Sequence, residues 1–216
     1  RDSNKGWVHA EYSLLPGSTD SRFRRERRGA KGRTQEIERL VARSLRAAID
    51  LEELGPIALN VDCDILNADG GTRCASITAA NLALRLGVRR LIAAGICLPQ
   101  NMRPTEEQRR SGWSAPVLSK EDQMAHEMRV MPHDVAAISV GLIDGQAYLD
   151  LDYNLDSNAD VDMNVVKVSD GAFVEVQGTG EESTYQRDEL DALLDMADIG
   201  FSPLFEMQKS ILAGQE

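Results

Sequence analysis

The sequence predicts an α+β fold, and three patterns along its 216 residues support that class. Long segments with apolar residues at i, i+3 and i+4 spacing are typical of amphipathic helices. Shorter segments alternate apolar and polar residues, as half-buried strands do. Two pairs of such segments are each joined by an Asp-Gly turn, which indicates antiparallel hairpins. The length fits one sizeable domain or at most two small ones, and we expect a single domain.

The first half of the chain alternates strands and helices. Residues 6–15 have strand character, and a Pro-Gly turn ends them. Thr34 is the expected N-cap of a helix that ends near residue 50. Residues 57–66 alternate cleanly as a half-buried strand, and a helix rich in Ala and Leu is expected from Thr72 to about Gly95. The apolar face of the first helix is formed by Ile37, Leu40, Val41, Leu45 and Ala48.

The second half begins with a polar segment and continues with hairpins. Residues 99–132 contain four prolines and one glycine, and we expect an inserted surface segment with a short helix at 121–130. Hairpins are predicted around Asp144-Gly145 and Asp170-Gly171. A final helix is expected from Asp188, with an interruption at Gly200.

The charge is unevenly distributed along the chain. The net charge of −11 argues, as an average, against nucleic acid as a partner. Charges separated by more than a Debye length of about 8 Å are largely screened, so local distribution matters more. Residues 144–162 hold six aspartates and no Lys or Arg. Residues 22–33 hold one acidic residue and seven basic ones, namely Arg22, Arg24, Arg25, Arg27, Arg28, Lys31 and Arg33.

Cysteine usage and hydropathy bear on location. The chain has three cysteines and no C-x-x-C pair, which supports neither a disulfide framework nor a zinc site. No apolar run approaches the roughly 20 residues that a membrane span needs. We therefore expect a cytoplasmic protein with no membrane partner.

A phosphate-binding turn is the first candidate site. The segment Asp69-Gly70-Gly71-Thr72-Arg73 lies between a predicted strand and a predicted helix. Glycines let backbone N–H groups form an anion nest, and a helix N-terminus adds free donors. Arg33, directly before another predicted helix, is a second side chain suited to phosphate. The alternatives are a plain strand-to-helix turn and a solvated arginine.

The aspartates of residues 150–162 are the second candidate site. Carboxylates are the hard oxygen ligands that Mg²⁺ uses, typically one or two of them with phosphate oxygens and water. A carboxylate beside the metal is also placed to donate a proton to a leaving oxygen. The alternatives are a solvated acidic loop and a calcium site, although no EF-hand pattern follows. With the basic segment, these features suit phosphoryl transfer on a polyanion.

Several motifs, in order along most of the chain, resemble the ribonuclease PH family. The most specific is the run from Asp62-Cys63-Asp64 through Ala68-Asp69-Gly70-Gly71-Thr72-Arg73 to Thr78. The others are residues 6–16, Gly32-Arg33-Thr34-Gln35-Glu36-Ile37, residues 156–166 and Glu175-Val176-Gln177-Gly178-Thr179. The resemblance implies the ribonuclease PH fold, which is of the ribosomal protein S5 domain 2 type.

The resemblance also implies an activity and an assembly. It implies that inorganic phosphate attacks the 3′-terminal linkage of RNA, such as a tRNA precursor, and releases a nucleoside 5′-diphosphate. It implies a homo-oligomer, a hexameric ring built as a trimer of dimers. It assigns phosphate binding to Arg33, Gly71, Thr72 and Arg73, Mg²⁺ binding and assistance to the leaving group to Asp156 and Asp162, and RNA guidance to Arg22 and Arg25.

Two departures and three alternatives accompany this interpretation. Family members carry strands before the segment that begins at Gly6, so we expect the sequence to lack its first N-terminal strands. The connection over 98–133 is longer than usual in the family. The alternatives are a non-catalytic RNA-binding subunit of an exosome-like ring, a metal-dependent hydrolytic nuclease and an acidic scaffold. A polynucleotide phosphorylase would need a second copy of the domain.

Overall fold

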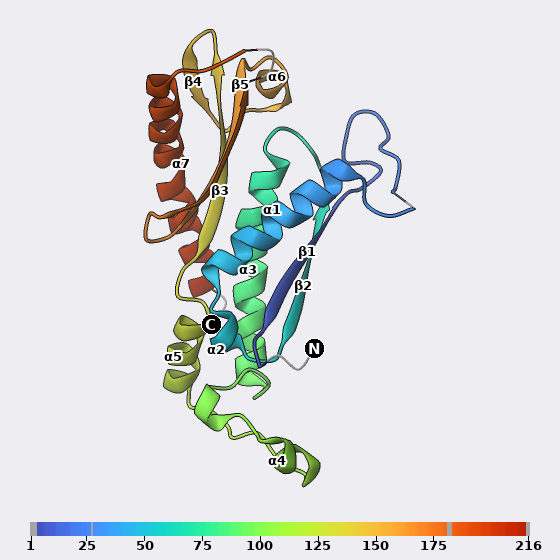
Figure 1. Ribbon diagram of the computed structural model, residues 1–216, viewed down its shortest axis with the longest axis vertical. Coiled ribbons are helices and arrows are strands. Elements are labelled where there is room, and N and C mark those ends of the chain that lie inside the picture. The colour runs from blue at the N-terminus through green and yellow to red at the C-terminus, as the bar shows by residue number, and fades with distance from the viewer. Residues whose placement is uncertain (1–3, 27, 181–182, 215–216) are drawn as a thin grey trace.

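The computed structural model describes residues 4–26, 28–180 and 183–214, and it combines helices with two separate β-sheets (Figure 1). This architecture confirms the predicted α+β class. The elements in chain order are β1 (Trp7–Leu14), α1 (Gly32–Ala48), α2 (Leu51–Leu54), β2 (Ala58–Ile65), α3 (Thr72–Ala93), η1 (Gln100–Met102), α4 (Glu106–Arg110), α5 (Lys120–Val130), β3 (Val135–Ile143), β4 (Gln146–Leu149), α6 (Tyr153–Asp156), β5 (Val161–Val168), β6 (Phe173–Gly180) and α7 (Arg187–Ala213).

The two sheets differ in strand direction. β1 and β2 run parallel, with Trp7 opposite Ala58 and Leu14 opposite Ile65. A parallel pair needs a crossover connection, which α1 and α2 provide. The other strands form an antiparallel sheet in the order β4-β3-β5-β6. Both predicted hairpins, β3–β4 and β5–β6, are confirmed.

The elements stack in layers around two hydrophobic cores. α3 lies between the two sheets, and α7 covers the opposite face of the larger sheet (Figure 1). The first core joins β1, α1 and α3 to the larger sheet through fully buried side chains such as Ile37 and Ile77. The second core lies under α7 and includes Met163 and Leu193. β3 is buried on both faces because it contributes to both cores.

The strand predicted over 57–66 is confirmed as β2, and its burial alternates as expected. Leu59, Val61, Cys63 and Ile65 are half-buried against the first core, and the residues between them are exposed. The helix predicted from Thr72 is confirmed as α3, which ends at Ala93.

The start of the first helix was predicted wrongly. Thr34 is not the N-cap, because α1 begins at Gly32 and Lys31 occupies the cap position without a side-chain cap bond. The Glu26 carboxylate accepts a hydrogen bond from the Lys31 N–H at 2.9 Å, which fixes the chain just before the helix. Arg33 therefore lies in the first turn of α1 and not before it. After α1, the segment from Asp50 does not simply end the helix, because Asp50 caps the short helix α2.

The predicted interruption of the last helix is also wrong. α7 runs without a break from Arg187 to Ala213 and contains Pro203. A Cβ atom on Gly200 would overlap the Ile138 side chain, so the glycine allows close packing of α7 on β3. A glycine required for packing has the same sequence signature as one that ends a helix.

The segment 99–132 forms one helix that packs on the domain and one arm that projects from it. The helix predicted at 121–130 is confirmed as α5, whose Val130 is fully buried and whose Glu127 bonds Arg85 and Arg89 of α3 at 3.2 and 2.8 Å. α4 lies in the arm at the lower end of the molecule (Figure 1). Among the described residues, no helix is long and apolar enough to cross a membrane.

Candidate active site

The Gly-Gly turn joins β2 to α3 as the sequence predicted. Gly71 is the N-cap of α3 and has a φ of 68°, which favours glycine. α3 is 22 residues long, and the N–H groups of its first turn point toward the turn. The partial positive charge of the helix N-terminus therefore lies at Gly71, Thr72 and Arg73, where an anion would be stabilised.

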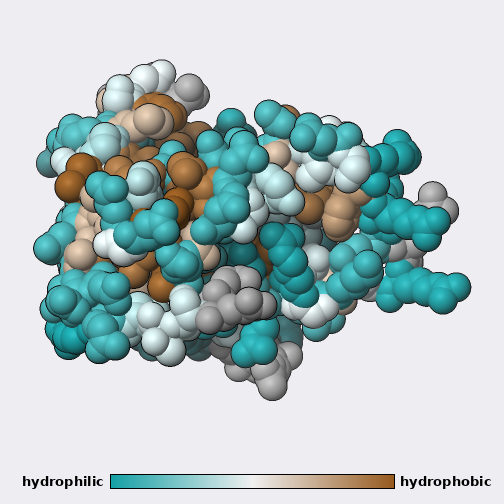
Figure 2. Space-filling model, turned by 90° about the horizontal axis from the view of Figure 1, so that it is seen from above, coloured by the Kyte–Doolittle hydropathy of each residue, from teal (hydrophilic) through white to brown (hydrophobic). Residues whose placement is uncertain are grey.

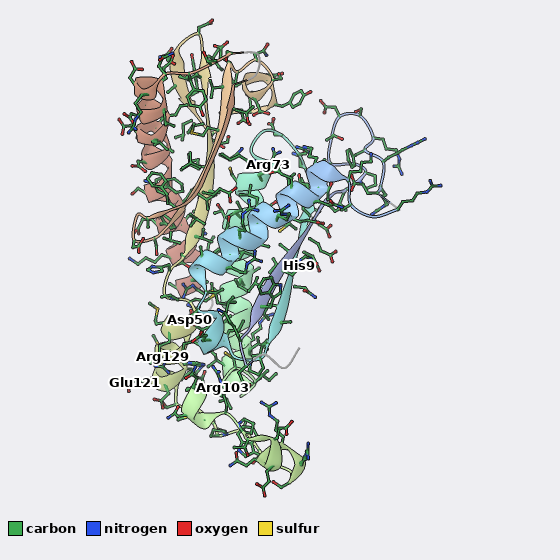
Figure 3. All side chains as sticks on the ribbon, in the orientation of Figure 1. His9, Asp50, Arg73, Arg103, Glu121 and Arg129 are labelled. Atoms are coloured by element: carbon green, nitrogen blue, oxygen red, sulfur yellow. The ribbon has the colours of Figure 1, made fainter. Side chains whose placement is uncertain are left out.

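Arg73 is held in place by a carboxylate on a neighbouring helix. Its Nη2 donates to Glu36 of α1 at 2.9 Å, and Gln177 of β6 donates to the other oxygen of Glu36 at 3.3 Å. Figure 3 shows Arg73 near the upper end of α3, beside α1. Its Nε is buried and has no hydrogen-bond partner among the described residues. A buried guanidinium N–H without a partner costs free energy unless a ligand satisfies it.

Thr72 and Arg33 are connected through Tyr12 of β1, which bonds Thr72 and lines the same cavity as Arg33. The Thr72 hydroxyl and the Tyr12 hydroxyl of β1 are hydrogen-bonded at 2.9 Å. Arg33 and Glu36 are three residues apart on α1 and share one face of it. Arg33 also lines a cavity of about 540 Å³ whose wall includes Arg25. The structure thus brings Arg25 and Arg33 together, whereas Arg22 is exposed outside that cavity. Arg27, another member of the basic segment, lies outside the described residues.

The acidic loop lies against the first turn of α3. Burial, followed by the negative charge of Asp162, raises the pKa of the Cys74 thiol, and Arg73 opposes this rise. Asp150 and Asp156 contribute smaller effects of the same sign as Asp162. Three aspartates and Arg73 therefore lie near enough to Cys74 to influence its pKa. The thiol stays protonated and donates to Asn164 at 3.0 Å, which makes it a structural group and not a nucleophile.

The two predicted metal ligands lie on different elements. Asp156 ends α6, and Asp162 is on β5 opposite Gly141 of β3 and Thr179 of β6. No group of three or more His, Cys, Asp or Glu side chains within the described part of the chain is arranged to hold a metal ion alone. A pair of carboxylates such as Asp156 and Asp162 fits Mg²⁺, which binds through one or two carboxylates and completes its shell with phosphate oxygens and water. The assignment of Asp156 and Asp162 stays a prediction.

Three polar side chains at this site were not identified from the sequence. Ser139, Asn164 and Gln177 are opposite one another on β3, β5 and β6 and face α3 and α1. Ser139 Oγ is buried without a partner among the described residues, and a Cβ atom added to Gly71 would lie 3.6 Å from it. The available signal was a polar residue within an otherwise apolar strand, because such residues rarely lie in a core without a purpose.

Known proteins of one family are similar to almost the whole chain. A 3′ exoribonuclease family model matches residues 1–87 with its domain 1 and residues 133–200 with its domain 2. The chain is 48% identical over 214 residues to ribonuclease PH of Corynebacterium diphtheriae, covering 98% of this chain and 76% of the relative. It is 46% identical over 204 residues to ribonuclease PH of a Synechococcus species, covering 94% and 71%.

Solved structures with the same fold are more distant in sequence. Rice Rrp46 superposes with a TM-score of 0.66 at 12% identity, covering 99% of this chain and 77% of the other. An Archaeoglobus fulgidus exosome with RNA bound to the active site gives a TM-score of 0.64 at 18% identity, covering 94% and 71%. At these identities the likeness establishes the fold alone. The family model and the close relatives show that the chain belongs to the 3′ exoribonuclease family, among the ribonuclease PH enzymes.

Proposed function

We propose that this chain shortens RNA from the 3′ end by phosphorolysis, and that the Gly-Gly turn holds the attacking phosphate. An oxygen of inorganic phosphate attacks the terminal phosphorus, and the bond from that phosphorus to the preceding 3′ oxygen breaks. The products are a nucleoside 5′-diphosphate and RNA with a new 3′ hydroxyl. The observation that carries this proposal is the partnerless Arg73 Nε at the N-terminus of α3, next to the acidic loop.

The phosphate site is built from Arg33, Gly71, Thr72 and Arg73. The backbone N–H groups at the start of α3 and the Thr72 hydroxyl donate to phosphate oxygens. Arg73 offers Nε while Glu36 orients its other end. Arg33 approaches from the first turn of α1. Two anions must meet here, and this excess of donors offsets their repulsion.

Asp156 and Asp162 are the residues that would hold Mg²⁺. When bound, the ion supplies charge neutralisation at the phosphate oxygens. A carboxylate of this loop would also give the leaving 3′ oxygen its proton. Because Asp162 is fixed within β5 and Asp156 belongs to a loop helix, the two carboxylates have different freedom to adjust.

The RNA strand would be guided by Arg22 and Arg25, and its class would be tRNA precursors and other 3′ tails. Both side chains belong to the loop between β1 and α1, which projects from the body of the molecule (Figure 1). A homo-oligomeric, hexameric ring built as a trimer of dimers would bring several such loops together. Exposed apolar side chains such as Leu66, with 75% of its surface exposed, are consistent with burial by another copy.

An incubation of RNA with a single-stranded 3′ tail tests this proposal. The protein and Mg²⁺ are mixed with the RNA, with and without inorganic phosphate, and the products are separated by chromatography. Release of nucleoside diphosphates only when phosphate is present supports phosphorolysis. Nucleoside monophosphates formed without phosphate would indicate hydrolysis, and RNA binding with no product would indicate a non-catalytic subunit; either result overturns the proposal.

A further inference from the structure

The Asp69 side chain connects the phosphate-binding turn to the acidic loop. Its Oδ1 accepts a hydrogen bond from the adjacent Gly70 N–H at 2.9 Å and another from the Tyr153 N–H at 2.6 Å. The first bond is local and is typical of a turn. The second joins residues 84 positions apart in the sequence. Asp69 therefore does more than shape its own turn.

The acidic loop is held at the residue where its helix begins. Tyr153 is the first residue of α6, and Asp156 is the last. Asp152 caps the same helix by accepting from the Leu155 N–H at 2.8 Å. The N–H of Tyr153 has no acceptor within α6 because first-turn amides lack intrahelical partners. Asp69 supplies that acceptor from outside, and so fixes the start of a helix that is only one turn long.

Backbone contact reinforces this connection. A Cβ atom on Gly70 would overlap the carbonyl oxygen of Leu151, so the turn and the loop touch through their main chains. Asp150, with a φ of 55°, donates its N–H to the Ser139 carbonyl at 2.8 Å. The loop from Asp150 to Asp156 is thus attached to β3 at its start and to the Asp69-Gly70 turn in its middle.

We infer that Asp69 is a positioning residue, which sets the distance of Asp156 from the phosphate held at Gly71–Arg73. This inference rests on the proposed function. One oxygen of Asp69 accepts hydrogen bonds from two backbone amides, so Asp69 acts through the loop. The groups that would contact the reactants are on the Gly71–Arg73 turn and on Asp156. An error of about 1 Å in such an arrangement lowers turnover by about 10²-fold. The phosphate site itself is built by Gly71, Thr72 and Arg73 and does not need the Tyr153 bond.

Two substitutions at Asp69 separate positioning from general stability. Asp69→Ala removes the acceptor, whereas Asp69→Asn keeps an oxygen at the same place and removes only the charge. We expect Asp69→Ala to lower kcat about 10²-fold and to change the KM for phosphate less than about threefold. Asp69→Asn is expected to retain kcat within about threefold of the original protein, because a neutral oxygen still accepts both hydrogen bonds. Asp195→Ala, at an exposed position of α7, is the matched control.

Hydrogen–deuterium exchange of the segment 151–158 supplies a readout that does not depend on activity. The Tyr153 amide should exchange faster in Asp69→Ala and at the original rate in Asp69→Asn. Unchanged kcat despite faster exchange would show that Asp69 is only structural, and unchanged exchange would show that it does not hold the loop; both overturn the inference. If Asp69→Ala does not fold, Asp69→Glu, which displaces the oxygen by one methylene, must show the same loss of kcat. Failure of the proposed function itself would appear differently, as an original protein without phosphorolysis whose exchange still responds to Asp69→Ala.

Discussion

At the scale of single residues, the site depends on how each charged group is partnered. Arg73 is oriented by Glu36 through one nitrogen and keeps a second nitrogen without a partner among the described residues. A guanidinium suits this arrangement because its donors are fixed in one plane, so an anchored end leaves the other end correctly aimed. Replacement of the Arg73 guanidinium should therefore weaken phosphate binding more than it slows the later steps of the reaction.

We predict that Arg73→Lys raises the apparent KM for phosphate by about 10- to 100-fold, because lysine is a point charge that cannot serve Glu36 and phosphate in one plane. The measurement is the initial rate of diphosphate release over a range of phosphate concentrations. Arg43→Lys is the control, since Arg43 lies on α1 and pairs with Glu175 at 2.7 and 3.0 Å. An equal effect of the two variants would contradict a specific role for Arg73.

His126 makes a second prediction at this scale, on stability. Burial, and then the charges of Arg129 and Arg103, lower the pKa of His126 to about 4. The Glu53 carboxylate at 3.8 Å and the Cys97 sulfur at 3.7 Å are its other neighbours. In the unfolded chain His126 binds a proton below about pH 6.5, whereas in the folded chain it does so only near pH 4. The neutral imidazole thus supports stability above pH 6.5, and this support is lost as the pH falls toward 4.

Urea unfolding at pH 7.5 and at pH 4.5 measures this effect. The original protein should lose about 2 kcal/mol more than His126→Gln over that interval, because glutamine does not titrate. Protonation of carboxylates also lowers the free energy of unfolding in this interval, but it does so equally in both proteins. Identical pH dependence of the two proteins would show that His126 is accessible to protons in the folded state.

The sequence predicted the position of the Gly-Gly turn better than it predicted the contacts of its residues. Gly71, Thr72 and Arg73 lie at the start of α3 because a local pattern of strand, turn and helix placed them there. Their contacts with Tyr12 and Glu36 join separate elements, and no spacing along the chain encodes such contacts. Asp69 belonged to the recognised motif, but its bond to Tyr153 required the fold.

At the scale of elements, α3 organises the molecule. It contacts both sheets, α1, α5 and α7, and its N-terminus carries the Gly-Gly turn. Periodicity predicted the elements with local signals, such as the β3–β4 hairpin, whose turn residues Asp144 and Gly145 both have positive φ. Periodicity failed at Thr34 and Gly200. At the first position a hydrogen bond from the Lys31 backbone N–H to Glu26 decided the outcome, and at the second close packing did.

A buried ion-pair network attaches α5 to α3. Arg85 is almost fully buried and pairs with both Glu127 and Asp134, while Arg89 pairs with Glu127. We predict that Glu127→Ala lowers the free energy of unfolding by about 3 kcal/mol, because it leaves Arg85 buried with half of its charge compensation. Glu121→Ala, at an exposed position of the same helix (Figure 3), should change it by less than about 0.5 kcal/mol. Chemical denaturation measures both, and equal effects would mean that the network contributes nothing beyond helix propensity.

At the scale of the whole molecule, opposite charges are concentrated in different segments despite the net charge of −11, with seven basic residues in 22–33 and six aspartates in 144–162. Figure 2 views the end that carries the site, and it shows a mostly hydrophilic side where the loop between β1 and α1 projects. Hydrophobic side chains gather on the opposite side of that view, over α7 and the larger sheet. RNA should therefore bind in a salt-dependent way even though the protein as a whole is acidic.

We predict that the double variant Arg22→Ala, Arg25→Ala weakens RNA binding and makes it less sensitive to salt. Loss of two phosphate contacts should reduce the slope of log K against log salt by about 1.4, since each contact with a single strand contributes about 0.7. Fluorescence anisotropy of a labelled RNA without phosphate or Mg²⁺ gives this slope. The variant Arg109→Ala, Arg110→Ala removes the same charge from α4, at the far end of the molecule, and should leave the slope unchanged. The same reduction in both variants would indicate that net charge alone governs binding.

The arm that contains α4 offers an anchoring point for experiments on single molecules. It extends from the end of the fold opposite the Gly-Gly turn (Figure 1), and its Gly112 has a φ of 80° with open space around it. A biotinylation peptide or a dye inserted between Ser111 and Gly112 would replace an exposed junction, one residue before Trp113, which packs against the first core. An enzyme tethered there would present its catalytic end to the solution, so that the shortening of one RNA strand can be followed in real time.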